Sequence, residues 1–440
     1  MRDVKGKCVL VLGLGETGMS MAKWLESHGA RVRVADSRVD PPGRAALEAL
    51  PGVTLHLGGF PAEAFADVDL VAISPGLAPN DPAFASGLAR CTARGVAIVG
   101  DVELFARSLA QQAVRPRVAA ITGTNGKTTV TTLAGAMCRA AGVDCEVAGN
   151  ISPAVLDALL RRERDGKPAE AWVLELSSFQ LETTSSLAAD AATVLNVTDD
   201  HLDRHGSMEN YAAAKARIFA GAGVQVLNRD DPRSLAMAIP GRTVITFGAD
   251  APRREDDYGL RAEGKRLWLA RGSRRLIATD ELRLAGLHNA VNALAAIALC
   301  RALGLPEEPL LDALREFRGL PHRVELVREL DGVRFYDDSK GTNVGATVAA
   351  LAGLGGDAGK VVLIAGGDGK GQDFSPLAQP VAQHARAVVL IGRDAGLIET
   401  ALGGTRVPVQ RAKDMGEAVE RAALLAEQGD AVLQIGRAHV

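Results

Sequence analysis

Residues 121–129 form a glycine-rich segment that also carries one lysine and several threonines. The segment follows the apolar run 118–120 directly and precedes a helical pattern over residues 130–141. Glycines let backbone N–H groups crowd around an anion, and the amino terminus of the following helix adds its dipole. Lys127 supplies a positive charge, and the hydroxyl of Thr128 suits Mg²⁺. The segment therefore predicts a phosphate-binding loop. Its residues are Gly123, Thr124, Asn125, Gly126, Lys127, Thr128 and Thr129.

The spacing of this loop departs from the common pattern, because Gly123 lies three rather than five residues before Gly126. An ordinary turn between a strand and a helix would explain the glycines alone. It would not require the order Gly-Lys-Thr-Thr at the start of the helix, and this order favours phosphate binding.

Carboxylates and a histidine follow two neighbouring apolar runs. Glu175 ends the run 172–175, and the run 193–197 is followed by residues 198–205, which contain three aspartates and His201. The carboxyl ends of parallel strands meet at one edge of a sheet, so these side chains are expected beside the phosphate loop. Oxygen and imidazole ligands there predict a site for Mg²⁺. Lys215 lies in a helical pattern over 211–217, and its position alone predicts a solvated lysine.

A second glycine-rich turn lies near the amino terminus. Gly13, Gly15 and Gly18 follow the first apolar run and open a helical pattern, while Asp36 ends the second run. This is the dinucleotide fingerprint, with an acid placed to accept from a ribose hydroxyl. It predicts an NAD-dependent oxidoreductase or, since the turn specifies only a diphosphate, a site for a uridine diphosphate group. Residues 74–76 end another strand at the same sheet edge and support a pocket there.

The elements that position these residues alternate in kind. Short runs that are apolar on both faces are separated by helical patterns, which predicts parallel, doubly wound sheets of the α/β class. Breaks near residues 106–116 and 319–321 divide the chain into three domains. We expect a Rossmann-like domain over residues 1–106, a central P-loop-type domain with a mostly parallel sheet over 107–319, and a second Rossmann-like domain over 320–440. The charged stretch 253–275 predicts peripheral hairpins.

Composition excludes several classes of function. The chain has 440 residues, of which 47% are hydrophobic and 23% charged, and a net charge of −3. This charge and an aromatic content of 4% argue against a nucleic-acid-binding surface. No apolar stretch reaches membrane-spanning length, no secretory signal opens the chain, and the five cysteines form no C-x-x-C pair. We expect a cytoplasmic monomer with reduced thiols, acting on small molecules.

Taken together, these motifs resemble the Mur ligases of peptidoglycan precursor synthesis. The segments that carry the resemblance span nearly the whole chain. They are residues 13–18, 74–76, 100–105, 123–129, 149–151, 174–182, 195–204, 288–292, 319–323, 338–343 and 366–370.

The resemblance implies a role for residues in each domain. A UDP-linked substrate, and not NAD, is expected at Gly13, Leu14, Gly15, Glu16, Thr17, Asp36, Ser37, Arg38, Ser74 and Gly76, with Asn150, Ser177 and Gln180 facing its sugar-peptide part. ATP is expected at the phosphate loop and at Asn292, Arg323 and Asp338. D-Glutamate is expected at Lys340, Thr342 and Lys370. Mg²⁺ is expected at Thr128, Glu175, His201 and Lys215, and the catalytic residues are expected to be Lys127, Glu175, His201 and Lys215.

The implied reaction is the ATP-dependent joining of D-glutamate to UDP-N-acetylmuramoyl-L-alanine through an acyl phosphate. A related ligase with a different amino-acid specificity and an NAD-dependent oxidoreductase remain the alternatives. In this family the lysine equivalent to Lys215 carries a carbamate, which is chemically sensible because an ammonium repels a cation and a carbamate supplies oxygen ligands. We therefore expect Lys215 to be N6-carboxylated.

The end of the chain departs from the family pattern. After the run 431–434 the family continues into a Ser-Pro-Ala segment and a terminal helix, whereas this chain ends with Ile435 to Val440. These last residues resemble translated adaptor sequence. We therefore expect a truncated reading frame, an incomplete D-glutamate site and weak turnover.

Overall fold

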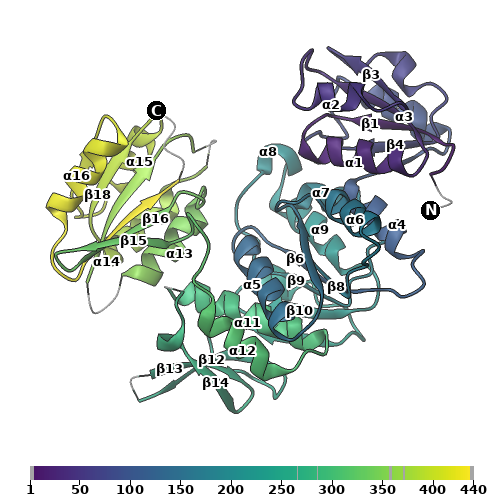
Figure 1. Cartoon of the computed structure of the whole chain (residues 1–440). Helices are drawn as coiled ribbons and strands as arrows, with labels where there is room; N and C mark the ends of the chain where they lie inside the picture. The colour runs from purple at the N-terminus through teal and green to yellow at the C-terminus, as the bar shows by residue number, and fades with distance from the viewer. Residues whose placement is uncertain (1–3, 265, 285, 356–358, 370–371, 437–440) are drawn as a thin grey trace.

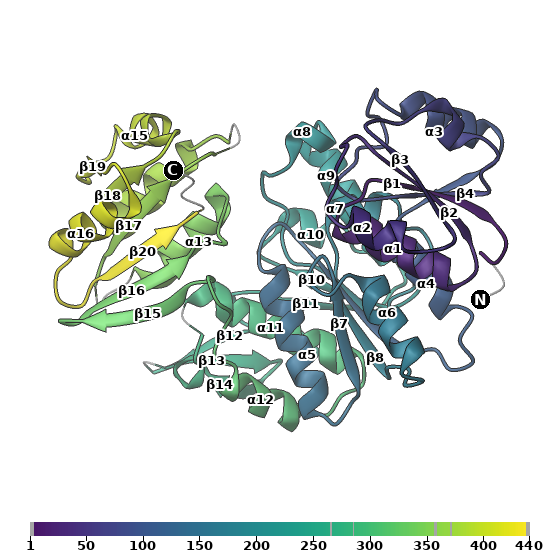
Figure 2. The same cartoon turned by 45° about the horizontal axis from the view of Figure 1, so that its top comes forward.

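The computed structural model describes residues 4–264, 266–284, 286–355, 359–369 and 372–436. Three lobes follow one another along the chain, and each is built around its own largely parallel sheet (Figures 1 and 2). The α/β class and the three-lobed architecture are those predicted.

The first lobe contains a five-stranded parallel sheet in the order β3-β2-β1-β4-β5. Alternate residues of β1 belong to two different core clusters, Val9 and Val11 to one and Leu10 and Leu12 to the other, so helices cover both faces. The strands are β1 (Cys8–Leu12), β2 (Arg31–Asp36), β3 (Val53–Leu57), β4 (Leu70–Ile73) and β5 (Ala97–Val99). The helices are α1 (Glu16–Ser27), α2 (Arg44–Glu48), η1 (Ala62–Phe65), α3 (Ala85–Ala93) and α4 (Asp101–Leu109).

The middle lobe contains a six-stranded parallel sheet in the order β11-β10-β9-β6-β8-β7. Its strands are β6 (Arg117–Thr122), β7 (Cys145–Gly149), β8 (Ala171–Glu175), β9 (Ala191–Val194), β10 (Val224–Asn228) and β11 (Val244–Phe247). Its helices are α5 (Lys127–Ala140), α6 (Val155–Arg164), α7 (Ser178–Glu182), α8 (Leu202–His205), α9 (Met208–Ala216), η2 (Arg217–Phe219), α10 (Pro232–Leu235), η3 (Thr279–Glu281), α11 (Leu287–Ala302) and α12 (Glu307–Glu316). The predicted hairpins form a small antiparallel sheet of β12 (Tyr258–Glu263), β13 (Arg266–Arg271) and β14 (Arg274–Ala278).

The third lobe contains a six-stranded sheet in the order β15-β16-β20-β17-β18-β19, of which only the edge strand β15 is antiparallel to its neighbour. The strands are β15 (Glu325–Leu330), β16 (Val333–Asp338), β17 (Val361–Gly366), β18 (Ala385–Ile391), β19 (Val409–Arg411) and β20 (Ala431–Ile435). The helices are α13 (Val344–Leu354), η4 (Ser375–Leu377), α14 (Ala378–His384), α15 (Ala395–Leu402) and α16 (Met415–Leu425).

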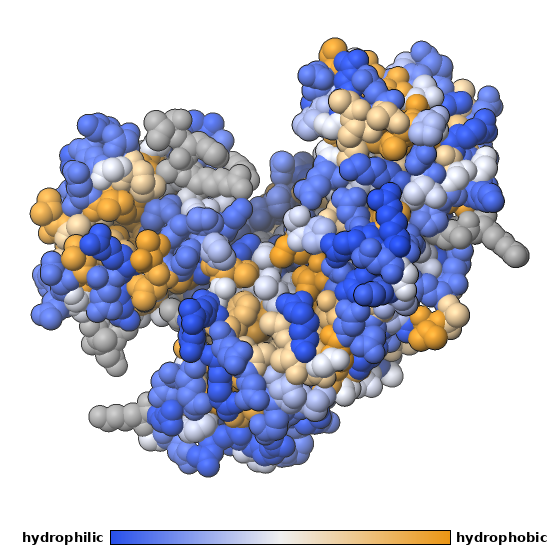
Figure 3. All heavy atoms as spheres, in the orientation of Figure 1, coloured by the Kyte–Doolittle hydropathy of each residue, from blue (hydrophilic) through white to orange (hydrophobic). Residues whose placement is uncertain are grey.

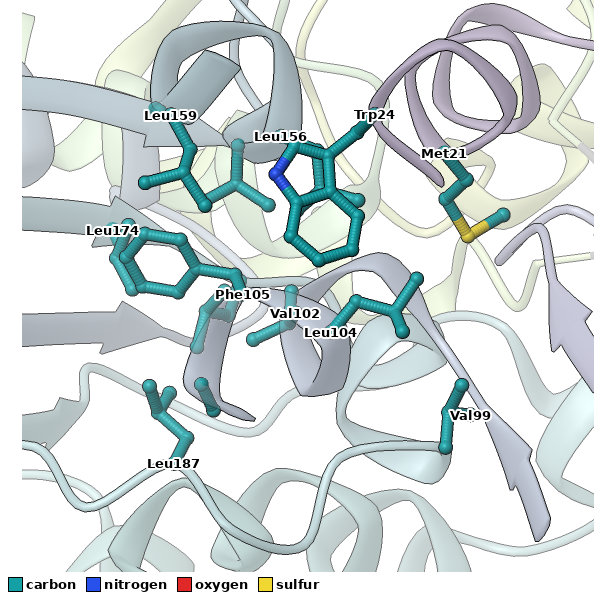
Figure 4. Close-up of a cluster of buried hydrophobic side chains, with 14 of the residues drawn as sticks. Met21, Trp24, Val99, Val102, Leu104, Phe105, Leu156, Leu159, Leu174 and Leu187 are labelled. Carbon is teal, nitrogen blue, oxygen red and sulfur yellow. The ribbon is translucent and has the colours of Figure 1, made fainter. Parts of the chain in front are cut away.

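The first and middle lobes share one hydrophobic cluster. Trp24 of α1 and Phe105 of α4 are buried in it (Figure 4), as is Trp172 of β8. The rings of Phe105 and Trp172 meet edge to face with centroids 4.8 Å apart. Helix α4 packs against α6 and α7 of the middle lobe, and the predicted domain limit at residue 106 falls inside this helix. The first and middle lobes therefore bury a common apolar surface.

The middle and third lobes meet through polar contacts near the phosphate loop. Asn125 and Asn343 exchange two amide hydrogen bonds, of 3.0 and 3.3 Å, and Arg323 donates to Thr128. In Figure 3 a hollow separates the third lobe, on the left, from the first lobe. The linker between the lobes contains two non-glycine residues with positive φ, His322 at 64° and Val324 at 48°. Within the described residues, no helix is both long and apolar enough to cross a membrane.

Candidate functional site

The phosphate loop connects β6 to α5. Gly126 precedes the helix with φ of 83°, a left-handed conformation that favours glycine, and Lys127 is the first helical residue. The Nζ atom of Lys127 donates to the carbonyl oxygens of Gly123 and Thr124, at 2.9 and 2.8 Å. Burial lowers the pKa of this ammonium, an effect that the nearby carboxylate of Glu175 opposes. Lys127 therefore lies folded over the loop that an incoming phosphate would occupy.

Lys215 of α9 is only 1% exposed, although its position in the sequence alone predicted a solvated side chain. Its Nζ atom donates to the carbonyl of Gly123 at 2.9 Å and lies 4.4 Å from the ring centroid of Tyr211. Burial, and then the charge of Lys127, hold its pKa well below the ordinary value. Two lysine amines thus meet at one carbonyl oxygen, which places Lys215 inside the candidate site.

Glu175 ends β8 beside the loop and is buried. Its Oε1 atom accepts from Nδ2 of Asn150 at 2.9 Å, whereas its buried Oε2 atom has no hydrogen-bond partner among the described residues. A buried, unpartnered carboxylate oxygen is costly unless it meets a cation, so this atom suits a metal ligand.

His201 immediately precedes α8, with φ of 55° and a side chain that is 42% exposed. Its Nε2 atom lies 3.6 Å from Oδ2 of Asp200, and burial lowers its pKa. A lowered pKa keeps the ring neutral near pH 7, and neutral imidazole is the form that binds metals.

A cavity of about 410 Å³ lies between the phosphate loop and the third lobe. Asn292, Arg323 and Asp338, the predicted nucleotide contacts, all line it. Nη2 of Arg323 donates to Oγ1 of Thr128 at 2.8 Å. Arg323 would therefore have to move before the Oγ1 lone pair that accepts this hydrogen bond could bind a cation. Burial raises the pKa of Asp338 to about 7.

A second cavity, of about 290 Å³, lies at the carboxyl edge of the first sheet. The carboxylate of Asp36 accepts from the backbone N–H of Leu14 at 2.6 Å and pairs with Arg38 at 2.8 Å. Hydrogen bonds from Arg38 hold the pKa of Asp36 at about 2. All the residues predicted for the UDP group in this lobe line the cavity. They are Gly13, Leu14, Gly15, Glu16, Thr17, Asp36, Ser37, Arg38, Ser74 and Gly76.

A third cavity, also of about 410 Å³, lies in the third lobe, and Lys340 and Thr342 line it. Lys340 lines the nucleotide cavity as well, so the two cavities adjoin at this residue. Lys370, the remaining residue predicted for D-glutamate, lies outside the described residues.

The residues predicted to face the sugar-peptide part of the UDP-linked substrate lie in different surroundings. Asn150 is exposed beside Glu175. Ser177 caps α7, and Gln180 completes that capping box. Gln180 is buried, and its Nε2 atom donates to Asp101 of α4 at 3.0 Å. The amide of Gln180 is thus engaged at the junction between the first two lobes.

Two residues without a predicted role also belong to the site. Asn343 caps α13 and contacts Asn125 of the phosphate loop. Tyr211 lies under Lys215 and pairs its hydroxyl with Oγ1 of Thr124 at 3.2 Å. Asn343 follows the candidate residues Lys340 and Thr342 closely in sequence, and that proximity was an available signal. Tyr211 lies one helical turn before Lys215, which became informative only once Lys215 was found buried.

Comparison with known proteins gives family matches over most of the chain. The family model described as Mur ligase MurD-like, N-terminal domain, matches residues 7–100. The Mur ligase middle domain matches residues 121–300, and the Mur ligase, glutamate ligase domain matches residues 322–438.

Curated relatives match over almost the entire chain. The UDP-N-acetylmuramoylalanine–D-glutamate ligase of Nitrosospira multiformis is 58% identical, with 98% of this chain and 90% of the relative covered. The enzyme of the same name from Aromatoleum aromaticum is 57% identical, with 98% and 93% covered. This coverage contradicts the expectation that foreign residues follow Gln434 of a truncated chain. The glutamate ligase domain model itself continues to residue 438, and Ile435 lies within β20.

Solved structures share the fold at low sequence identity. MurF from Acinetobacter baumannii has a TM-score of 0.62 at 18% identity, covering 99% of this chain and 88% of that one. MurF from Thermotoga maritima, solved in complex with ADP, has a TM-score of 0.61 at 18% identity, covering 99% and 92%. The family matches, the near full-length relatives and the shared fold agree: the chain belongs to the Mur ligase family.

Proposed function

We propose that this chain joins D-glutamate to UDP-N-acetylmuramoyl-L-alanine by ATP-dependent amide ligation in peptidoglycan precursor synthesis. The observation that carries the proposal is the cluster of Lys127, Glu175 and Lys215 around a glycine-rich loop, in a chain 57–58% identical to ligases of that name. The same family membership supports a UDP site at the amino-terminal glycines, and the NAD-dependent oxidoreductase is discarded.

The reaction must first activate a carboxylate, which is a poor electrophile because it is negatively charged and would have to expel oxide. The alanyl carboxylate attacks the γ-phosphate of ATP, the bond to the β-phosphate breaks, and an acyl phosphate and ADP form. Lys127 lies where it can neutralise the charge that develops on the transferred group. The amine of D-glutamate then attacks the carbonyl, and the tetrahedral intermediate expels phosphate to leave the amide.

The residues present fit Mg²⁺. The unpartnered oxygen of Glu175, the neutral ring of His201 and the hydroxyl of Thr128 offer three ligand types from three different elements. When bound, Mg²⁺ would neutralise the phosphate oxygens. An ammonium at Lys215, beside Lys127, would repel the ion, whereas a carbamate there would supply it with oxygen ligands.

The surroundings of Lys215 favour carboxylation of its amine. A lowered pKa raises the fraction of unprotonated amine, whose lone pair can form an N–C bond to CO₂ with loss of a proton. We expect carboxylated protein in an intact-mass spectrum recorded under bicarbonate, and a Lys215→Ala variant that loses both the added mass and most of its activity. Only free amine in the wild-type protein would contradict this prediction.

The third lobe binds D-glutamate, whose amine accepts the acyl group. Lys340, Thr342 and Lys370 supply the cations and hydroxyl that the two carboxylates of D-glutamate require. Because ATP would lie in the cavity between the lobes, closure of the third lobe over the nucleotide is part of the proposal. We further propose domain limits of 1–106, 107–319 and 320–440, a monomeric state and a cytoplasmic location.

Phosphate release tests the reaction directly. We expect release only when ATP, the UDP-linked muramoyl-alanine and D-glutamate are all present, and little with L-glutamate or other amino acids. A preference for another amino acid would instead support a related ligase. Substrate labelled with ¹⁸O in its alanyl carboxylate should transfer label to the released phosphate, and absence of transfer would rule out the acyl phosphate.

A further inference from the structure

Arg204 of α8 connects the first and middle lobes, although no role was predicted for it. Its side chain is 12% exposed. Its Nη2 atom donates to the carbonyl of Leu77 in the first lobe at 3.1 Å and to Oε2 of Glu182 in α7 at 2.6 Å. Its guanidinium carbon also lies 4.8 Å from the ring centroid of Phe179. Figures 1 and 2 both show α8 at the end of the middle lobe nearest the first lobe.

The carbonyl that Arg204 binds belongs to the wall of the amino-terminal cavity. Leu77 lines this cavity and closes a turn in which its N–H donates to the carbonyl of Ser74 at 3.0 Å. The side chain of Leu77 packs on Gly13, where an added Cβ would lie 2.9 Å from its Cδ1 atom. A ligand that contacts the glycine turn or residues 74–76 therefore restrains the position of the Leu77 carbonyl.

The other end of the connection reaches His201. The ring of Phe179 lies edge-on to His201, with centroids 4.9 Å apart, and stacks on His205 at 5.6 Å. His205 is fixed in turn, because its Nε2 atom lies 3.0 Å from Oγ of Ser178 and its Nδ1 atom lies 3.4 Å from Glu182. The ring of His201 is 42% exposed, and among the described residues it contacts Phe179, Tyr211 and Asp200.

We propose that Arg204 is a positioning residue that couples occupancy of the amino-terminal cavity to the orientation of His201 through Phe179. The guanidinium is planar and its donors are fixed, so a shift of the Leu77 carbonyl tilts the group over the Phe179 ring. Arg204 touches neither the nucleotide cavity nor the phosphate loop. The inference rests on the proposed function, because it takes His201 to be a metal ligand and the first cavity to bind the UDP group.

The first test uses metal-free protein with labelled histidines. UDP alone is the probe, because it fills the first cavity and lacks the sugar-peptide part that would reach His201. The signal of His201, one of eight histidines, is identified by its loss in His201→Gln. We expect UDP to move this signal in the wild-type protein and to leave it in place in Arg204→Met, while calorimetry shows that UDP still binds both.

Two further variants keep the test decisive. Phe179→Leu retains both hydrogen bonds of Arg204 but removes the ring beside His201, so it should uncouple the signal as Arg204→Met does. Arg107→Met is the matched control, because Arg107 pairs with Glu103 at the same junction, at 2.9 Å, but contacts neither Phe179 nor His201. It should keep the coupling, even where it lowers the melting temperature.

Turnover gives an independent readout. Arg204→Met and Phe179→Leu should lower kcat about 10- to 100-fold, the usual effect of removing a group that orients a metal ligand, with the affinity for ADP unchanged. A UDP-induced shift of the His201 signal that persists in both variants would overturn the inference, as would a wild-type signal that does not respond to bound UDP. Failure of the wild-type protein to bind UDP or to release phosphate would instead overturn the proposed function.

Discussion

Two glycine-rich turns of this chain occupy equivalent places in their sheets but have different surroundings. One follows β1 and the other follows β6, each strand lies inside a parallel sheet, and each turn leads into a helix. Gly13 and Gly126 even share a φ of 83°. Near the first turn, Asp36 and Arg38 pair with each other and Glu16 begins the helix, whereas Lys127, Lys215 and Glu175 surround the second turn.

This difference shows what the shared motif does and does not specify. A left-handed glycine before a helix presents N–H groups to an anion at either turn. The second turn adds two lysine amines that donate to its backbone carbonyls and a carboxylate oxygen without a hydrogen-bond partner among the described residues, which are groups suited to moving a phosphoryl group. Under the proposed function, the first turn would hold a diphosphate, and the second would hold a triphosphate and act on it.

Removing Lys127 should have the largest effect on activity, and it should act at the second turn alone. We expect Lys127→Ala to lower kcat about 10³-fold, because a preorganised charge at the transferred phosphate is lost. Binding of the UDP-linked substrate at the first turn should not change. Phosphate release and calorimetry measure the two effects, with Lys413→Ala as the control because Lys413 is 79% exposed and distant in the fold. Turnover within a few-fold of the wild-type rate would show that the second turn is not catalytic.

Matched alanine substitutions at the two glycines should separate the ligands. A left-handed conformation costs a non-glycine residue about 1–2 kcal/mol, or roughly tenfold in affinity when the strain is relieved by distorting the site. The Cβ of Gly126→Ala would lie 2.6 Å from Oδ1 of Asn292, and that of Gly13→Ala would lie 2.9 Å from Leu77. We therefore expect a higher KM for ATP in the first variant and for the UDP-linked substrate in the second. If either variant raised the KM for ATP and the KM for the UDP-linked substrate equally, this would contradict separate sites for the two ligands.

Much of this arrangement was predictable from sequence, because local patterns encode it. Apolar runs broken by glycine turns predicted the strands, and glycine positions predicted that turns leading into helices follow β1 and β6 at the carboxyl edges of their sheets. The burial of Lys215 was not predictable in this way. It depends on the packing of α9 against a carbonyl 92 residues earlier in the chain, and no local pattern records that contact.

The same limit applies to contacts between lobes. Arg204 and Leu77 are separated by 127 residues, and Asn125 and Asn343 by 218. Each residue is an ordinary polar or apolar side chain in its own segment. Their roles arise only from how the lobes are placed, which the sequence pattern of a single segment does not determine.

The smallest expected effect concerns pH and stability, and it has opposite signs at the two turns. Asp36 has a native pKa of about 2 and an ordinary value of 3.8, so its ionisation stabilises the folded chain above pH 4, and this stabilisation is lost as the pH falls towards 2. Since Arg38 is half-exposed, we expect Asp36→Asn to cost only about 1 kcal/mol at neutral pH, with the difference from wild type vanishing near pH 2.

Lys127 has a lowered native pKa, so its charge destabilises the folded chain and stability should rise with pH below its ordinary value of 10.5. Thermal unfolding of wild type, Asp36→Asn and Lys127→Met across pH measures both trends. A difference between wild type and Asp36→Asn that stays constant down to pH 2 would show that Arg38 does not hold the carboxylate ionised, and the first turn would then lack its internal charge pair.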